Sequence, residues 1–279
     1  MNEDNKKFIS KYNIEVDPEW LEEFHISKDI MKAPKGHNWK ANQLLVFNNT
    51  ALGRYLIESD SVKKISGNKK SLSIYGVSPR GFEQMSALDA AMDEKIQLSF
   101  FTGIAGSGKT LVACQAALDL LFKRDVDRII LTRPAVTAGE DIGFLPGDKD
   151  AKLAPYTAAI YDNMYRLYKK EIIDKHIQDG HIEVIPLAFM RGRNLSDCVV
   201  VVDEAQNITD RQMELLLGRL CNGSKMILCG DAAQIDLKDK NVLYKKILDK
   251  IKILETLNNK DFSVIFPEMQ DFLLLCKQS

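Results

Sequence analysis

A glycine-rich segment that follows an apolar run constrains the fold of this chain more than any other feature. Residues 97–113 read QLSFFTGIAGSGKTLVA, in which Gly103 to Thr110 fit the pattern G-x-x-x-x-G-K-[ST]. The apolar run predicts a buried strand, and the residues after it predict a helix. Glycines let backbone N–H groups converge on phosphate oxygens, and the N-terminus of the helix adds positive potential. The predicted phosphate-binding loop consists of Gly103, Ile104, Ala105, Gly106, Ser107, Gly108, Lys109 and Thr110.

A second apolar run ends in two carboxylates. Residues 199–206 read VVVVDEAQ, so a strand would carry Asp203 to the carboxyl edge of a sheet, where ligands of parallel sheets bind. We predict that Thr110 and Asp203 hold Mg²⁺ and that Lys109 reaches the β- and γ-phosphates of a nucleotide. Glu204 is placed to orient and deprotonate an attacking water. An acidic pair that caps a helix is the alternative interpretation.

Two glutamines complete the candidate site. LCGDAAQ at residues 228–234 ends a third strand with Gln234, whose amide is placed to contact a γ-phosphate or the attacking water. Gln84 lies about 20 residues before the glycine loop, and its amide offers both a donor and an acceptor to a nucleotide base. A strand-to-loop turn and an exposed helix glutamine are the respective alternatives.

Alternating strand and helix patterns predict the fold. From residue 78 onward, apolar runs such as RIILT and CVVVV alternate with helical patterns, which is typical of a parallel sheet covered by helices on both faces. We predict an α/β fold with a single RecA-like P-loop NTPase lobe, preceded by a small β-rich module. The predicted segments are an N-terminal extension (1–37), the β-rich module (38–77), the P-loop core (78–240) and a C-terminal helical segment (241–279).

Composition excludes several classes of protein. The 38 Lys and Arg residues balance 39 Asp and Glu residues, so the chain is not a globally basic nucleic-acid binder. Five cysteines without a CxxC pair indicate reduced thiols rather than a disulfide framework. The start lacks the apolar core of a signal peptide, and no apolar run approaches the roughly 20 residues of a membrane span. We therefore expect a cytoplasmic protein that does not bind a membrane.

These motifs resemble a known family. With the upstream glutamine, they look like the first motor lobe of superfamily 1 helicases. More narrowly, LTRPAVTAGEDIGFLPGDKDAKLAPY (131–156), IPLAFMRGRNLSDCVVVVDEAQN (185–207) and GDAAQIDL (230–237) closely resemble the PhoH-like family of phosphate-starvation-inducible ATPases. The resemblance covers about residues 76–240. It implies a single lobe that binds ATP, forms ring homo-oligomers, which we expect to be hexamers, and associates with RNA or another single-stranded nucleic acid.

The chain departs from the family pattern in two places. Residues 1–37 are too short for the nuclease domain that some members carry, so we predict no nuclease activity. No arginine follows Arg219, although the family has an arginine-bearing segment near its C-terminus. If a neighbouring subunit needs an arginine at its nucleotide, the candidates are Arg193, Arg219 and Arg133. Arg133 follows a strand at the catalytic edge, and we expect the Arg193 loop to open on the same edge.

The sequence thus predicts a Mg²⁺-dependent ATP hydrolase coupled to the binding or unwinding of RNA or single-stranded nucleic acid. An ATP-gated binding or scaffold protein with negligible turnover is the main alternative, which the absence of a late arginine favours. A small-molecule kinase on the same loop is a weaker one, because no acceptor pocket is evident.

Overall fold

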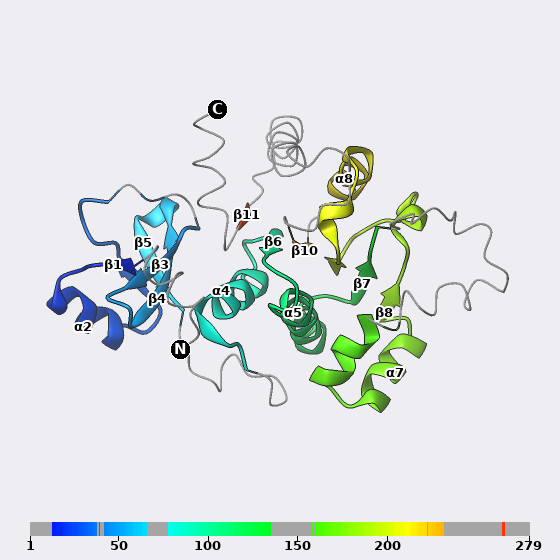
Figure 1. Cartoon of the computed structure of the whole chain (residues 1–279), viewed down its shortest axis with the longest axis horizontal. Coiled ribbons are helices and arrows are strands. Elements are labelled where there is room, and N and C mark those ends of the chain that lie inside the picture. The colour runs from blue at the N-terminus through cyan, green and yellow to red at the C-terminus, as the bar shows by residue number, and fades with distance from the viewer. Residues whose placement is uncertain are drawn as a thin grey trace. The chain divides into compact units, whose positions relative to one another are not determined.

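The computed structural model describes residues 13–37, 39, 42–65, 78–134, 158, 160–221, 223–231 and 264–265. The chain divides into two compact units, one of residues 1–73 and 78–90, the other of residues 74–77 and 91–279 (Figure 1). Within the described ranges, no helix is long and apolar enough to cross a membrane.

The larger unit is built on a six-stranded sheet in which every neighbouring pair of strands is parallel. The strand order is β11-β6-β10-β9-β7-β8. The strands are β6 (Leu98–Thr102), β7 (Arg128–Thr132), β8 (Ile182–Val184), β9 (Cys198–Val202), β10 (Lys225–Gly230) and β11 (Val264–Ile265). All five residues of β9 are buried, as expected for a strand whose two faces are both covered.

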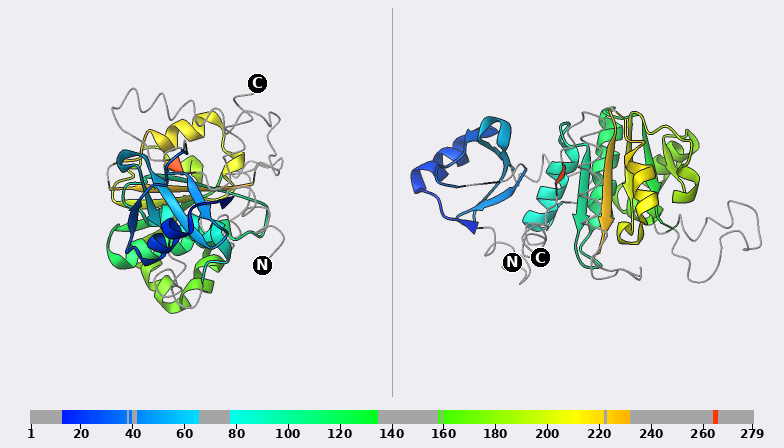
Figure 2. Two further views of the ribbon diagram at one scale, coloured as in Figure 1. Left: turned by 90° about the vertical axis from the view of Figure 1, so that its left-hand side faces the viewer. Right: turned by 90° about the horizontal axis from the view of Figure 1, so that it is seen from above.

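Helices cover both faces of this sheet, with α8 on one and α5 and α7 on the other (Figure 2). These helices are α5 (Lys109–Lys123), α7 (Lys170–Gln178) and α8 (Asp210–Leu217). Residues 160–167 are also helical. Two short 3-10 turns, η3 (Leu187–Met190) and η4 (Ala205–Asn207), flank β9. The predicted α/β fold with a parallel sheet is confirmed.

Helix α8 begins where the sequence favours it. Thr209 accepts from the backbone N–H of Gln212, while the Gln212 side chain accepts from the backbone N–H of Thr209, which forms a capping box. Met213, Leu216 and Leu217 then join the apolar cluster against the sheet. The helix thus begins directly after the segment that carries the candidate carboxylates.

The smaller unit contains a five-stranded mixed sheet in the order β1-β3-β4-β5-β2. Its elements are β1 (Asn13–Ile14), α2 (Pro18–Ile26), β2 (Ile30–Lys32), β3 (Leu44–Phe47), β4 (Ala51–Leu56), η1 (Ile57–Ser59) and β5 (Ser61–Lys64). Asp17 caps α2 through the N–H of Glu19, and the ring of Trp20 stacks on Phe24 at 5.1 Å. Because β1 and β2 pair with β3 and β5, the residues that we predicted as an N-terminal extension share one sheet with the β-rich module.

Helix α4 (Gly81–Met92) lies within the range 78–240 that we predicted as the P-loop core. Residues 78–90 belong to the smaller unit. A buried charge explains this, since Arg54 is 1% exposed and its Nε donates to Asp89 at 2.9 Å. Phe82 and Met85 also pack against a cluster of that unit. The predicted C-terminal helical segment lies outside the described residues, except for residues 264–265, which form a strand.

Candidate functional site

The phosphate loop joins β6 to α5, as predicted. Gly106 and Gly108 have φ values of 79° and 90°, a region that side chains other than glycine disfavour. The Nζ of Lys109 donates to the carbonyl oxygens of Gly103 at 2.5 Å and Ile104 at 2.9 Å. The loop therefore curves around the Lys109 ammonium group, next to the N-terminus of a 15-residue helix.

The two predicted metal ligands meet. The hydroxyl of Thr110, in the first turn of α5, donates to Oδ1 of Asp203 at 2.7 Å. Asp203 directly follows β9, and only β10 separates β9 from β6. Among the residues described, no group of three His, Cys, Asp or Glu side chains is arranged to hold a metal by itself. Mg²⁺ commonly uses one or two protein oxygens together with substrate phosphates, so this pair fits it.

Glu204 lies beside Asp203 in a left-handed conformation, with φ of 52°. Such values are uncommon for residues other than glycine and often occur at functional sites. Its Oε1 lies 3.3 Å from Nη2 of Arg133, and its Oε2 accepts from Nε2 of Gln206 at 2.5 Å. Both carboxylate oxygens thus have partners.

Gln206 is a site residue that our sequence analysis did not assign to any role. It is 1% exposed. Its Oε1 accepts from the backbone N–H of Asp231 at 3.1 Å, while its amide nitrogen contacts Glu204. Gln206 therefore connects Glu204, at the end of β9, with the residue that follows β10. Its position two residues after the carboxylate pair was the only available signal.

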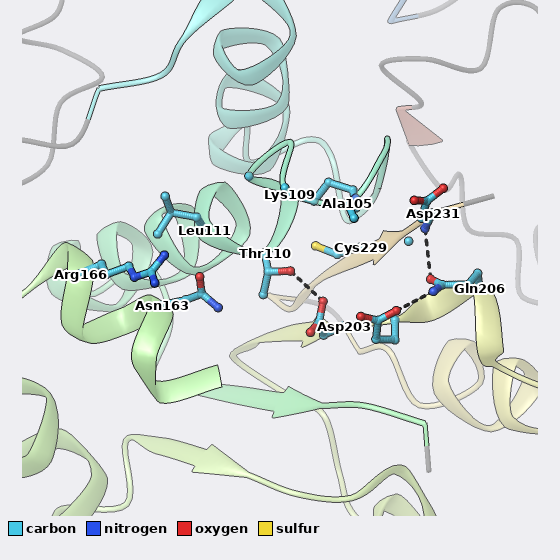
Figure 3. A pocket seen from close by; sticks show the side chains of 14 residues that line it. Ala105, Lys109, Thr110, Leu111, Asn163, Arg166, Asp203, Gln206, Cys229 and Asp231 are labelled. Atoms are coloured by element: carbon cyan, nitrogen blue, oxygen red, sulfur yellow. Dashed lines mark hydrogen bonds between the residues drawn. The ribbon is translucent and has the colours of Figure 1, made fainter. Parts of the chain in front are cut away.

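These groups surround a pocket of about 350 Å³ at the carboxyl edge of the sheet (Figure 3). Two further polar side chains in it, Asn163 and Arg166, come from the helix of residues 160–167 and were not predicted. The remaining lining residues are Ala105, Gly106, Gly108, Lys109, Thr110, Leu111, Asp203, Glu204, Gln206, Cys229, Gly230 and Asp231.

Two buried thiols lie under this edge. Burial raises the pKa of Cys114 to about 12, and the nearby Asp203 carboxylate adds to the shift. Burial, with Asp203 again contributing, holds the pKa of Cys229 well above its ordinary value. Both thiols are neutral near pH 7, so Cys229 forms part of the pocket wall as an apolar group and not as a nucleophile.

The roles of the two predicted glutamines stay predictions. Gln84 belongs to the smaller unit, where its Oε1 accepts from the backbone N–H of Arg80 at 2.7 Å. Its contact with a base stays a prediction. Gln234 lies outside the described residues.

The arginine candidates fall into two groups. Arg133 lies at the carboxyl edge and pairs with Glu204. Nη2 of Arg193 lies 2.7 Å from Glu183, and Arg219 donates to the Arg193 carbonyl at 3.1 Å. The next residue, Asn194, accepts from Arg128 at the start of β7.

Our expectation that the Arg193 loop opens on the catalytic edge was therefore wrong. The physical reason is that the segment between β8 and β9 crosses from the carboxyl edge to the amino edge. Arg193 lies on the part that has already crossed, because the carbonyl of Asn194 accepts from Arg128 at the start of β7. Neither Arg193 nor Arg219 lines the pocket.

Comparison with known proteins identifies similar sequences and a solved structure that aligns in part. A PhoH-like protein of Synechocystis sp. is 49% identical over 144 residues, which are 52% of this chain and 44% of that protein. A PhoH-like protein of Bacillus subtilis is 43% identical over 180 residues, which are 64% and 55% of the two chains. The matched region thus spans about half the length of these curated relatives. The solved UvsW helicase from bacteriophage T4 aligns with 60% of each chain, at 17% identity and a TM-score of 0.40.

A family model described as PhoH-like protein matches residues 76–270. This range includes the phosphate loop, both carboxylates, Gln206 and the helix that carries Arg166. The chain belongs to the PhoH-like protein family.

Proposed function

We propose that this protein is an ATP hydrolase that depends on Mg²⁺. The observation that carries the proposal is the 2.7 Å contact between Thr110 and Asp203, at the mouth of the phosphate loop. A hydroxyl and a carboxylate from two separate elements meet where a nucleotide phosphate would lie. Nucleotide binding is what membership of this P-loop family implies.

Five polar side chains of the pocket have roles in the proposed reaction. Lys109 binds the β- and γ-phosphates, and Thr110 and Asp203 would hold the metal ion. When bound, Mg²⁺ neutralises charge on the phosphate oxygens. Glu204 accepts the proton of the attacking water. Gln206 fixes the direction of the Glu204 carboxylate from its buried position.

One observation favours the second candidate function, an ATP-gated binding protein with negligible turnover. Arg133 and Gln206 occupy both oxygens of Glu204. A water molecule can reach the carboxylate in a productive direction only if it shares or displaces one of these partners. If both contacts persist and the remaining lone pairs of Glu204 do not reach the water, the protein binds ATP without hydrolysing it.

The coupling to nucleic acid and the assembly are expectations from the family resemblance. We propose RNA or another single-stranded nucleic acid as the partner and a ring of identical subunits, expected as a hexamer. A ring would let a neighbouring subunit cover the open side of the pocket, since the larger unit supplies one sheet and one phosphate loop.

The test is the steady-state rate of ATP hydrolysis with and without single-stranded RNA, for the wild-type chain and for Glu204→Gln. We expect turnover that RNA stimulates and that the variant lowers by about 10² to 10⁴-fold, while MgATP binding persists. Tight MgATP binding with no turnover dependent on Glu204 would instead establish the gated binder. Absence of MgATP binding would exclude both.

A further inference from the structure

The helix of residues 160–167 forms a side of the pocket that neither the sequence motifs nor the family description assigns to any role. Asn163 and Arg166 line the pocket from this helix. They are three positions apart, so they project from one face. Figure 3 shows both side chains next to Leu111, on one side of Thr110.

This helix is fixed against the element that follows the phosphate loop. Ile160, Met164 and Leu167 are all at most 2% exposed, and they form its buried stripe. The ring of Tyr168 lies 4.5 Å from that of Phe122, in α5. The pocket-facing side chains therefore come from a packed scaffold, which suits a binding group that must keep its position.

A second contact holds the C-terminal half of the same helix. The hydroxyl of Tyr165 donates to Oδ1 of Asp174, in α7, at 2.7 Å. Burial and this hydrogen bond raise the pKa of Tyr165 to about 12, so the hydroxyl remains a donor throughout the physiological range. The residue next to Arg166 is thus anchored at all relevant pH values.

The charges around the pocket indicate what Arg166 would bind. Among the described residues that line the pocket, Asp203, Glu204 and Asp231 bring three carboxylates, and Lys109 and Arg166 are the basic side chains. Arg166 is exposed and has no hydrogen-bond or ion-pair partner within the described part of the chain. A guanidinium group offers two parallel donors that match the spacing of phosphate oxygens.

The position of Arg166 along the pocket selects which phosphates it reaches. Gln206 and Asp231 lie on the opposite side of Thr110 from Arg166 (Figure 3), and Glu204 is hydrogen-bonded to Gln206. In the proposed reaction Glu204 marks the γ-phosphate end, because it activates the water that attacks there. The side with Leu111 and Arg166 is therefore the end of the nucleotide that carries the α- and β-phosphates.

We propose that Arg166 binds the α- and β-phosphates of the nucleotide within its own subunit, with Asn163 on the same wall. The inference rests on the proposed nucleotide site, but not on turnover. Arg166 would thus act on the nucleotide held by the phosphate loop of the same subunit. Arg193 and Arg219 lie at the other edge of the sheet and do not line this pocket. Because ATP and ADP share these phosphates, Arg166 contributes equally to the binding of both.

Calorimetric titration tests this with two probes, MgADP and the non-hydrolysable analogue MgAMP-PNP. We expect Arg166→Ala to weaken the binding of both by a similar factor, about tenfold to about a hundredfold, and Arg166→Lys to recover part of the loss. The isosteric change Asn163→Asp adds a negative charge to the same wall and should weaken both as well. Arg191→Ala, at an exposed arginine that does not line the pocket, is the matched control and should leave both affinities unchanged.

Three outcomes would overturn the assignment. One is unchanged affinity in Arg166→Ala while Lys109→Ala loses binding. Another is a loss confined to MgAMP-PNP, which would move Arg166 to the γ-phosphate. The third is a loss of affinity in Arg166→Ala that is not recovered in Arg166→Lys and that is accompanied by a lower thermal unfolding temperature of the variant. A wild-type chain that binds neither probe would instead refute the proposed function, so the two failures are distinguishable.

Discussion

The two edges of the parallel sheet in the larger unit carry similar kinds of side chain and use them differently. At the carboxyl edge, Thr110 comes from α5 and Asp203 and Glu204 follow β9, and all three line a pocket. At the amino edge, Arg193 pairs with Glu183, and Arg219 donates to a backbone carbonyl. The charged side chains at the carboxyl edge line a cavity, whereas Arg193 and Arg219 at the amino edge form contacts within the chain.

The direction of a strand therefore decides at which edge of the sheet a polar residue next to its end lies, and so which groups it meets. Parallel strands place every residue that follows them at one edge, so groups distant in sequence converge there. Residues that precede the strands gather at the opposite edge. There, Arg128 and Arg219 both donate to carbonyls of residues 193–194, which holds adjacent loops together.

We expect the greatest loss of ATP turnover from a substitution at the C-terminal end of β9, and the same substitution at the other end of this strand is its control. Asp203→Asn removes the negative charge proposed for the metal site and should lower ATP turnover by at least about a hundredfold. Asp197→Asn, directly before β9, is the matched control, because Asp197 is exposed with φ of 50° and asparagine tolerates that conformation. It should change turnover by less than about twofold.

Turnover against Mg²⁺ concentration is the measurement for both variants. Asp203→Asn should also require more Mg²⁺ for half of its maximal rate. Equal losses in the two variants would contradict the division between the edges.

A smaller effect is expected at Gln206. Gln206→Ala removes the hydrogen bond to Glu204 and the acceptor for the buried N–H of Asp231. We expect turnover to fall about tenfold and the free energy of unfolding to fall by about 1–3 kcal/mol, with MgADP affinity little changed. Single-turnover hydrolysis and urea unfolding measure the two quantities.

Gln212→Ala is the control for that change. It removes the hydrogen bond that the Gln212 side chain accepts from the backbone N–H of Thr209 in the capping box of α8. The free energy of unfolding should fall by at most about 1 kcal/mol, and the turnover should not change. If both glutamine variants lost turnover equally, the positioning role of Gln206 would be refuted.

The part of the site that could be predicted is the part that follows from strand ends. Lys109, Thr110, Asp203 and Glu204 each lie a few residues after an apolar strand, so their convergence required only that the strands be parallel. The fold class was predictable for the same reason, because continuous apolar runs between helical patterns have few other interpretations.

What could not be predicted depends on packing between elements. The helical pattern of residues 160–167 separates apolar from polar positions, but it does not reveal that the helix packs beside α5. Asn163 and Arg166 therefore resembled solvated residues. In the smaller unit, β1 has two residues and β2 has three, too few for a periodic signal. The rings of Trp20 and Phe24 in α2 lie 4.9 and 5.3 Å from that of Phe47 in β3, which helps hold this segment to the sheet.

The smallest expected effect is at the amino edge. Arg193→Ala breaks a half-exposed ion pair with Glu183, and such pairs contribute about 0–1 kcal/mol to stability. We expect turnover to stay within about twofold of the wild type, measured at a protein concentration where the assembly state has been determined by light scattering. Arg193→Lys controls for loss of the guanidinium with retention of the charge.

A tenfold or greater loss of turnover in Arg193→Ala, with unchanged unfolding, would mean that this arginine reaches the nucleotide of a neighbouring subunit. The amino edge of one subunit would then complete the carboxyl edge of the next, and the contrast between the edges would hold only within a single chain.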